Sequence, residues 1–190
     1  MKPLLGVLGA VGRWPDWAAH FNRGRAGLIE SFLALIVCFP ALWLVLEASL
    51  EAGAPPEPDR MDSYVVPEPE PLIFALIVGA YLLSFAVTAG VIALLMRRTE
   101  RLALWLTARN WAVVYLCAAL GLVFALVLYA GLPYAVGSGV LFAAYLGLLP
   151  IDIRLAQRAG GFPLMSAVLI GCVVVSTSLV VLLTGLRLVL

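Results

Sequence analysis

The feature that most constrains the fold of this chain is a set of five long apolar runs. They occupy residues 27–46, 72–96, 111–130, 136–151 and 162–186. A transmembrane helix needs about 20 predominantly apolar residues. Of all residues, 64% are hydrophobic and 12% are charged, whereas soluble domains have about 45–50% and about 25%. The sequence therefore predicts an all-α integral membrane protein, a bundle of five transmembrane helices that form a single membrane domain over 1–190.

Two prolines affect the predicted spans. Pro40 lies in the middle of the first run, where it removes one backbone hydrogen bond and should kink the helix. Pro150 is expected to end the helix of the run at 136–151 near the interface. Because that run is shorter than the others, a re-entrant segment is the alternative to a full span there.

Residues 1–26 are predicted to form a cytoplasmic segment at the membrane surface. Trp14, Trp17 and Phe21 are spaced i, i+3, i+7 and would share one face of a short interfacial helix. Tryptophan rings are favoured at the level of the headgroups. A docking site for a partner is the alternative. The apolar part of 1–14 is short, so we expect a surface segment and not a cleaved signal peptide.

The uneven distribution of charge predicts the orientation of the spans. Ten of the 12 basic residues lie before the first run or at 97–109 and 152–161, and cytoplasmic loops carry the excess of Lys and Arg. Seven of the 11 acids lie in the proline-rich segment 47–71, which we expect to be a flexible periplasmic loop. A partner-binding or cation-attracting loop is its alternative. The prediction is a multi-pass protein of the bacterial inner membrane, with the N-terminus cytoplasmic and the C-terminus periplasmic.

Small side chains recur every four residues in three of the runs. The stripes are Ala80–Ser84–Thr88, Cys117–Gly121–Ala125 and Gly139–Ala143–Gly147. Such stripes allow two helices to approach closely, so they predict helix–helix contacts. A polar path past Tyr81 and Thr88 is the alternative for the second run.

Polar residues at the cytoplasmic ends of the first and third runs predict one specific contact. We expect Arg109 to meet Glu30 or a lipid phosphate, and Asn110 to bond a neighbouring helix; a proton or substrate site is the alternative for Glu30. Residues 102–106 should lie along the membrane surface, and Asp152 in the headgroup zone, so that no charge lies near the centre of a span. The predicted polar and packing cluster comprises Glu30, Ser84, Thr88, Arg109, Asn110 and Gly121.

The sequence offers no set of residues for catalysis. Its one histidine, His20, lies in the interfacial segment, and its three cysteines are each isolated within an apolar run. No metal site, cofactor motif or glycine-rich phosphate loop is therefore predicted. The net charge of +1 gives no reason to expect nucleic acid as a partner. We predict a protein that is not an enzyme, with no catalytic, metal or cofactor-binding residues.

Three segments carry a resemblance to a known group of proteins. They are GRAGLIESFLALIVCFP at 24–40, TERLALWLTARNWAVV at 99–114, and the segment 151–183, a short basic linker with a small-residue-rich last span. Together they resemble small uncharacterised multi-pass inner-membrane proteins of alphaproteobacteria, which are similar in plan to Yip-type five-helix membrane proteins. Ile151 to Gly161 lacks the aromatic residues of that group. The resemblance implies five spans and no enzymatic activity.

These observations predict how the protein works. We expect a scaffold, an assembly factor or an accessory subunit that acts through helix packing in the lipid bilayer. Its partner would be another membrane protein or a second copy of the chain. The alternative is a small transporter or channel that is active as an oligomer. Its polar path would use Glu30, Tyr81, Thr88, Asn110, Tyr115 and Ser176.

Overall fold

The computed structural model describes residues 2–12, 14–22, 24–53 and 70–187. It contains α1 (Lys2–Gly12), the 3-10 turn η1 (Trp17–His20), α2 (Arg25–Ala34), the 3-10 turn η2 (Leu35–Val37), α3 (Cys38–Gly53), α4 (Pro71–Leu95), α5 (Thr99–Ala130), α6 (Tyr134–Arg158) and α7 (Leu164–Arg187). Within this part of the chain, five helices are long and apolar enough to cross a membrane, and α2, η2 and α3 together form the first. The predicted all-α bundle with a short N-terminal helix is confirmed.

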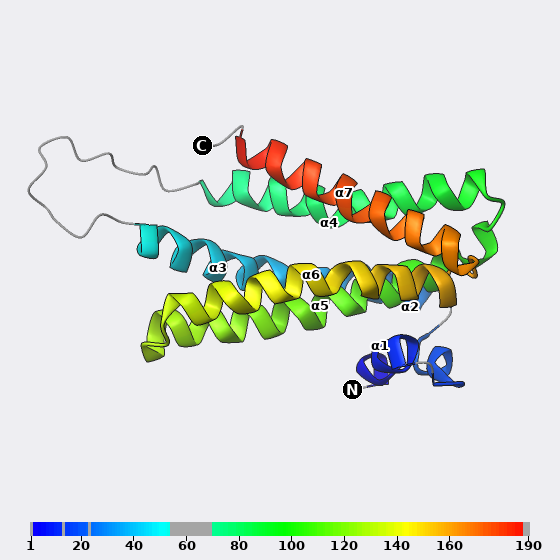
Figure 1. Ribbon diagram of the computed structural model, residues 1–190, viewed down its shortest axis with the longest axis horizontal. Helices are drawn as coiled ribbons and strands as arrows, with labels where there is room; N and C mark the ends of the chain where they lie inside the picture. The colour runs from blue at the N-terminus through cyan, green and yellow to red at the C-terminus, as the bar shows by residue number, and fades with distance from the viewer. Residues whose placement is uncertain (1, 13, 23, 54–69, 188–190) are drawn as a thin grey trace, which may run out of the picture.

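The five spans form two layers in Figure 1. One layer contains α4 and α7, which pack against each other, and the other contains α3, α5 and α6. Helix α5 lies at the centre and contacts α1, α2, α3, α4 and α6. The two layers diverge towards the end where α3 finishes and α4 begins (Figure 1). Side chains of α5 therefore reach nearly every other element.

Helix α5 begins earlier than predicted, and α6 ends later. Residues 102–106, expected to lie along the membrane surface, belong to the first turns of α5, and Trp105 to Asn110 are buried. The Trp105 ring accounts for this, because its edge-on contacts with Phe85 and Phe162, at 5.6 and 5.5 Å between centroids, hold this part of the helix inside the bundle. Helix α6 likewise continues through Pro150, which is exposed, as far as Arg158. Both helices consequently carry charged residues into the bundle.

The first span is interrupted where Pro40 predicts it. Proline cannot donate to the carbonyl four residues earlier, which here is that of Ile36. The helix tightens into a 3-10 turn at Leu35–Val37 and continues as α3. The lost hydrogen bond is thus seen as a local change of helix type, and the kink itself stays a prediction.

The N-terminal segment folds differently from the prediction. The helix spans Lys2–Gly12, and Trp17–His20 forms only one 3-10 turn after Pro15. A Cβ atom at Gly6 would lie 2.6 Å from the Phe21 ring, and one at Gly9 would lie 2.9 Å from the Trp17 Cβ. Because these glycines leave room, Trp17 and Phe21 fold back onto α1 and are buried, while Trp14 stays exposed. The expected shared face of Trp14, Trp17 and Phe21 is therefore wrong.

The predicted acidic loop falls only partly within the described residues. Helix α3 continues to Gly53, so Glu47 and Glu51 are helical and exposed. Residues 54–69 lie outside the described part of the chain. The prediction of a flexible loop stays a prediction.

Candidate functional site

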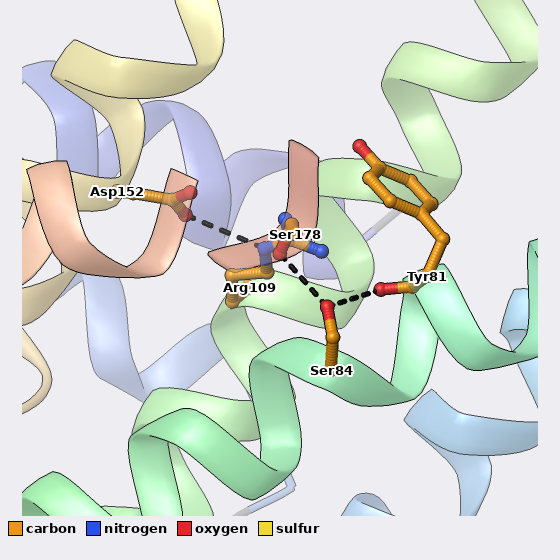
Figure 2. Close-up of polar contacts among 5 residues, drawn as sticks. All are labelled: Tyr81, Ser84, Arg109, Asp152 and Ser178. Carbon is orange, nitrogen blue, oxygen red and sulfur yellow. Dashed lines mark hydrogen bonds and ion pairs between the residues drawn. The ribbon is translucent and has the colours of Figure 1, made fainter. Parts of the chain in front are cut away.

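An ion pair inside the bundle joins α5 to α6. Arg109 and Asp152 are 3% and 2% exposed, and the Arg109 Nε donates to the Asp152 Oδ1 at 3.4 Å. The guanidinium carbon also lies 4.6 Å from the centroid of the Phe85 ring on α4, a cation–π distance. Figure 2 shows the pair beside Ser84, Ser178 and Tyr81. Both charges face the interior of the bundle, because α5 and α6 extend further than predicted. The expectation that no charge lies near the centre of a span stays a prediction.

The second carboxylate oxygen of Asp152 has no partner. Within the described residues, two buried side-chain polar atoms lack a hydrogen bond, namely the Asp152 Oδ2 and the Trp105 Nε1. A buried polar atom without a partner costs about 1–3 kcal/mol, and more when it is charged. The Asp152 Oδ2 is therefore a strong acceptor for any donor that reaches it.

Two serines join α4 to α7 beside the ion pair. The Ser84 hydroxyl donates to the Tyr81 carbonyl at 2.6 Å, and the Ser84 and Ser178 hydroxyl oxygens are 2.9 Å apart. Because Ser84 donates to its own helix, Ser178 must donate to Ser84. Figure 2 shows this chain of hydroxyls next to the guanidinium of Arg109. Ser84 thus serves as a polar contact between helices, as its place in the small-residue stripe suggests.

Asn110 bonds a neighbouring helix, but Glu30 does not meet Arg109. The Asn110 Nδ2 donates to the Ser31 Oγ at 3.2 Å, and both residues are buried. Glu30 is exposed on the same helix as Ser31. Adjacent residues on a helix point about 100° apart, so when Ser31 faces Asn110, Glu30 faces outward. The predicted pairing of Glu30 with Arg109 is corrected to Asp152 with Arg109.

The other residues predicted to pack between helices differ in how closely a neighbouring helix approaches them. A Cβ atom at Gly121 would lie 2.9 Å from the Ala41 Cβ, so Gly121 marks a close approach of α5 to α3. Thr88 is half-buried on α4. On α6, Gly139 and Ala143 are exposed. This third stripe faces away from the described bundle.

Two adjoining hollows lie between the two helix layers. The larger is a cavity of about 270 Å³ with almost entirely apolar walls, and all five spans contribute to it. The smaller, of about 40 Å³, is lined by Arg109, Asp152 and Ser178. The two hollows share Tyr81, Tyr145, Leu148 and Leu182. Together they form a wedge with apolar walls and a polar apex.

The predicted transport path is not assembled in the described residues. Tyr81 lines both hollows. Glu30 and Ser176 are exposed, and Asn110 bonds Ser31. Tyr115 stacks on Trp111 with 5.8 Å between the ring centroids. These residues point to different neighbours, so they do not line one passage.

Asp152 and Ser178 are the residues of the site that sequence reasoning missed. A helix that ends at Pro150 predicts Asp152 at the headgroups, whereas α6 continues to Arg158. The available signal was that Asp152 lies between Ile151 and Ile153, and an acid within apolar sequence calls for a buried partner. Ser178 was one of three hydroxyl residues in a row, and spacing alone does not select among them.

Comparisons with models of protein families, with curated proteins and with solved structures gave no match to this chain. The resemblance to Yip-type five-helix membrane proteins therefore stays a prediction.

Proposed function

We propose that this chain is a non-enzymatic protein of the bacterial inner membrane that acts through helix packing, as a scaffold, assembly factor or accessory subunit. Its N-terminus would be cytoplasmic and its C-terminus periplasmic. The end of the bundle where α4 ends, α5 begins and α6 ends lies beside α1 (Figure 1). Those helix ends carry Arg97, Arg98, Arg101, Arg154 and Arg158, which support this orientation. Glu47 and Glu51 lie in the last turns of α3, and Glu70 directly precedes α4, at the other ends of those helices.

The observation that supports the proposal most strongly is that the other helices bury little of α6. In the most apolar 18 residues of α6, 11% are buried, against 22–39% in the other four spans. The same helix has the lowest mean hydropathy of the five. A span that faces lipid should be the most apolar, because lipid cannot satisfy polar groups. The least apolar span is here the least covered, which favours a protein partner on its outer face.

The outer face of α6 has the shape that a partner helix needs. Gly139 and Ala143 are exposed, and among the described residues no atom of another helix lies within 4 Å of a Cβ position at Gly139 or Gly147. Small residues at every fourth position let two helix backbones approach closely and pack without loss of side-chain entropy. The partner would be a transmembrane helix of another membrane protein or of a second copy of this chain.

The test is purification in mild detergent with a tag, followed by identification of bound subunits. Ala143→Trp should block the α6 face and abolish recovery of the partner. Ala80→Trp is the matched control, because Ala80 is an exposed alanine on α4 in the other layer, and it should retain the partner. Recovery of a clean wild-type monomer, or equal recovery with both variants, would refute the proposal.

A further inference from the structure

The wedge between the helix layers has the dimensions of a site for an apolar chain. Along α3 it extends from Leu42 to Ser49, and along α6 from Leu141 to Leu148. Seven residues of helix correspond to about 10 Å. Its volume of about 270 Å³ exceeds the about 150 Å³ of an engineered cavity that binds benzene. The larger hollow can therefore hold an aromatic ring or part of a hydrocarbon chain.

The apex of the wedge has the chemistry of a polar anchor. The smaller hollow of about 40 Å³ exceeds the about 10–15 Å³ that one water molecule needs. Asp152 lines it, and its unpartnered Oδ2 accepts a hydrogen bond. Arg109 lines it from the other side, and its bond to Asp152 uses one of its five N–H donors. The guanidinium also interacts with the Tyr81 side chain, and further donors stay available to a ligand. A group that both donates and accepts would fit between them.

The charges at the apex favour a neutral group. Arg109 and Asp152 compensate each other, so the apex carries no net charge. A charged headgroup would add an unpaired charge inside the bundle, and unpaired charges at membrane depth are costly. A hydroxyl satisfies both requirements, because it donates to the carboxylate and accepts from the guanidinium.

We propose that the wedge binds a neutral amphipathic molecule, with a hydroxyl placed at Arg109 and Asp152 and an apolar chain or ring between α3, α4, α5 and α6. Long-chain alcohols, diacylglycerols and lipid-soluble quinols share this chemistry. The site is independent of the α6 outer face, because its lining residues face the space between the layers. Ligand binding and partner binding can therefore fail separately.

The test uses palmityl alcohol that carries a photoreactive diazirine on its chain, with the full chain purified in detergent. Labelled peptides from the wild-type protein should include the α5 and α6 residues that line the larger hollow, such as Leu116 and Leu141. Unmodified palmityl alcohol should compete, whereas hexadecane should not. Equal competition by hexadecane would show that the wedge holds hydrocarbon without polar recognition, and it would overturn the proposal.

Two pairs of variants locate the labelling. Leu116→Trp should fill the larger hollow and lower labelling at least about tenfold, which corresponds to about 1.4 kcal/mol. Leu122→Trp is its control, because Leu122 is exposed on the same helix, and its labelling should match wild type. Leu141→Trp repeats the test from α6 with Leu146→Trp as control, in case one filled variant does not fold. Unchanged labelling in a folded Leu116→Trp or Leu141→Trp protein would contradict the site.

The choice of head group has its own test. Photoreactive palmitic acid in its anionic form should label the hollow less than the alcohol, and stronger labelling by the acid would overturn the neutral site. Competition by dioctanoylglycerol and by decylubiquinol then separates the two sources of the hydroxyl. Reduced labelling with either competitor supports the proposal and identifies the class of molecule that supplies the hydroxyl. If neither of them nor palmityl alcohol reduces the labelling, the proposal is refuted.

Discussion

At the scale of single residues, Arg109 and Asp152 join α5 to α6 through a buried ion pair. A buried ion pair is worth little against apolar residues of the same shape, because both ions must be desolvated. The removal of one partner, however, leaves the other charge buried and uncompensated. Asp152 has only one of its two oxygens bonded, so removal of Arg109 would leave both oxygens without that partner.

We expect Asp152→Ala to destabilise the protein by about 3–5 kcal/mol, since it leaves Arg109 unpaired inside the bundle. The double variant Arg109→Leu/Asp152→Leu should be more stable than Asp152→Ala. The measurement is equilibrium unfolding in mixed micelles of mild detergent and dodecyl sulfate. Arg154→Ala is the control on the same helix, because Arg154 bonds the nearby Gln157 of α6. If Asp152→Ala and the wild type unfold at the same fraction of dodecyl sulfate, the ion pair does not stabilise the bundle.

The sequence was sufficient to identify Arg109 and Asn110 as the polar pair of α5, but not to identify their partners. Asn110 meets Ser31, the immediate neighbour of the residue predicted for Arg109. One position along a helix changes the direction of a side chain by about 100°, and the rotation of a helix about its axis depends on the packing of all five spans. Asp152 was missed for a different reason, since Pro150 normally ends a helix in water but is tolerated in a span.

At the scale of elements, Arg158 fixes the N-terminal helix to the bundle. Its guanidinium donates to the carbonyls of Gly9 and Ala10 at 3.2 and 3.4 Å, and to that of Trp14 at 2.9 Å. It also lies 5.7 Å from the Trp17 ring centroid. A cation at a helix C-terminus satisfies the last carbonyls and interacts favourably with the helix dipole. One side chain at the end of α6 thus holds α1 and the Trp17–His20 turn.

We expect Arg158→Ala to release α1 while the five spans stay folded. Amide hydrogen exchange over Lys2–Gly12 should become about tenfold faster or more, because hydrogen bonds to a charged donor contribute about 1.5–3 kcal/mol. Arg158→Lys should have an intermediate effect, since an ammonium cannot reach three carbonyls in the manner of a guanidinium. Exchange measured by mass spectrometry should be unchanged in α1 for the control Arg154→Ala. Unchanged exchange in Arg158→Ala would mean that apolar contacts alone hold α1.

The three small-residue stripes show how far the contacts of a helix can be predicted from the spacing of its small residues. Each stripe predicts a close helix contact, and the pattern is the same in all three. In the structure Gly121 packs on Ala41, Ser84 bonds Ser178, and the Gly139–Ala143 face is uncovered. The spacing identifies a face of a helix, but the identity of what covers that face depends on the other helices, or on a partner.

At the scale of the whole molecule, five spans in two layers account for both an inner wedge and an outer face. Apolar composition and run length were sufficient to predict the number of spans, because bilayer thickness sets helix length. The divergence of α4 and α7 from α3, α5 and α6, which produces the wedge, has no signal in the sequence. Which helices pair within each layer depends on contacts between residues far apart in the chain, such as Ser84 with Ser178 and Arg109 with Asp152.

The central claim is five spans with the N-terminus cytoplasmic, and accessibility of single cysteines tests it most directly. In a variant with Cys38, Cys117 and Cys172 replaced by alanine, Glu51→Cys, Glu100→Cys and Arg187→Cys each introduce one thiol at an exposed position. A membrane-impermeant maleimide, applied to bacteria whose outer membrane alone is permeabilised, should label Glu51→Cys and Arg187→Cys. It should label Glu100→Cys only after the inner membrane is opened. Labelling of Glu100→Cys with the inner membrane intact would contradict the orientation. Protection of Arg187→Cys together with labelling of Glu51→Cys would contradict the five-span count.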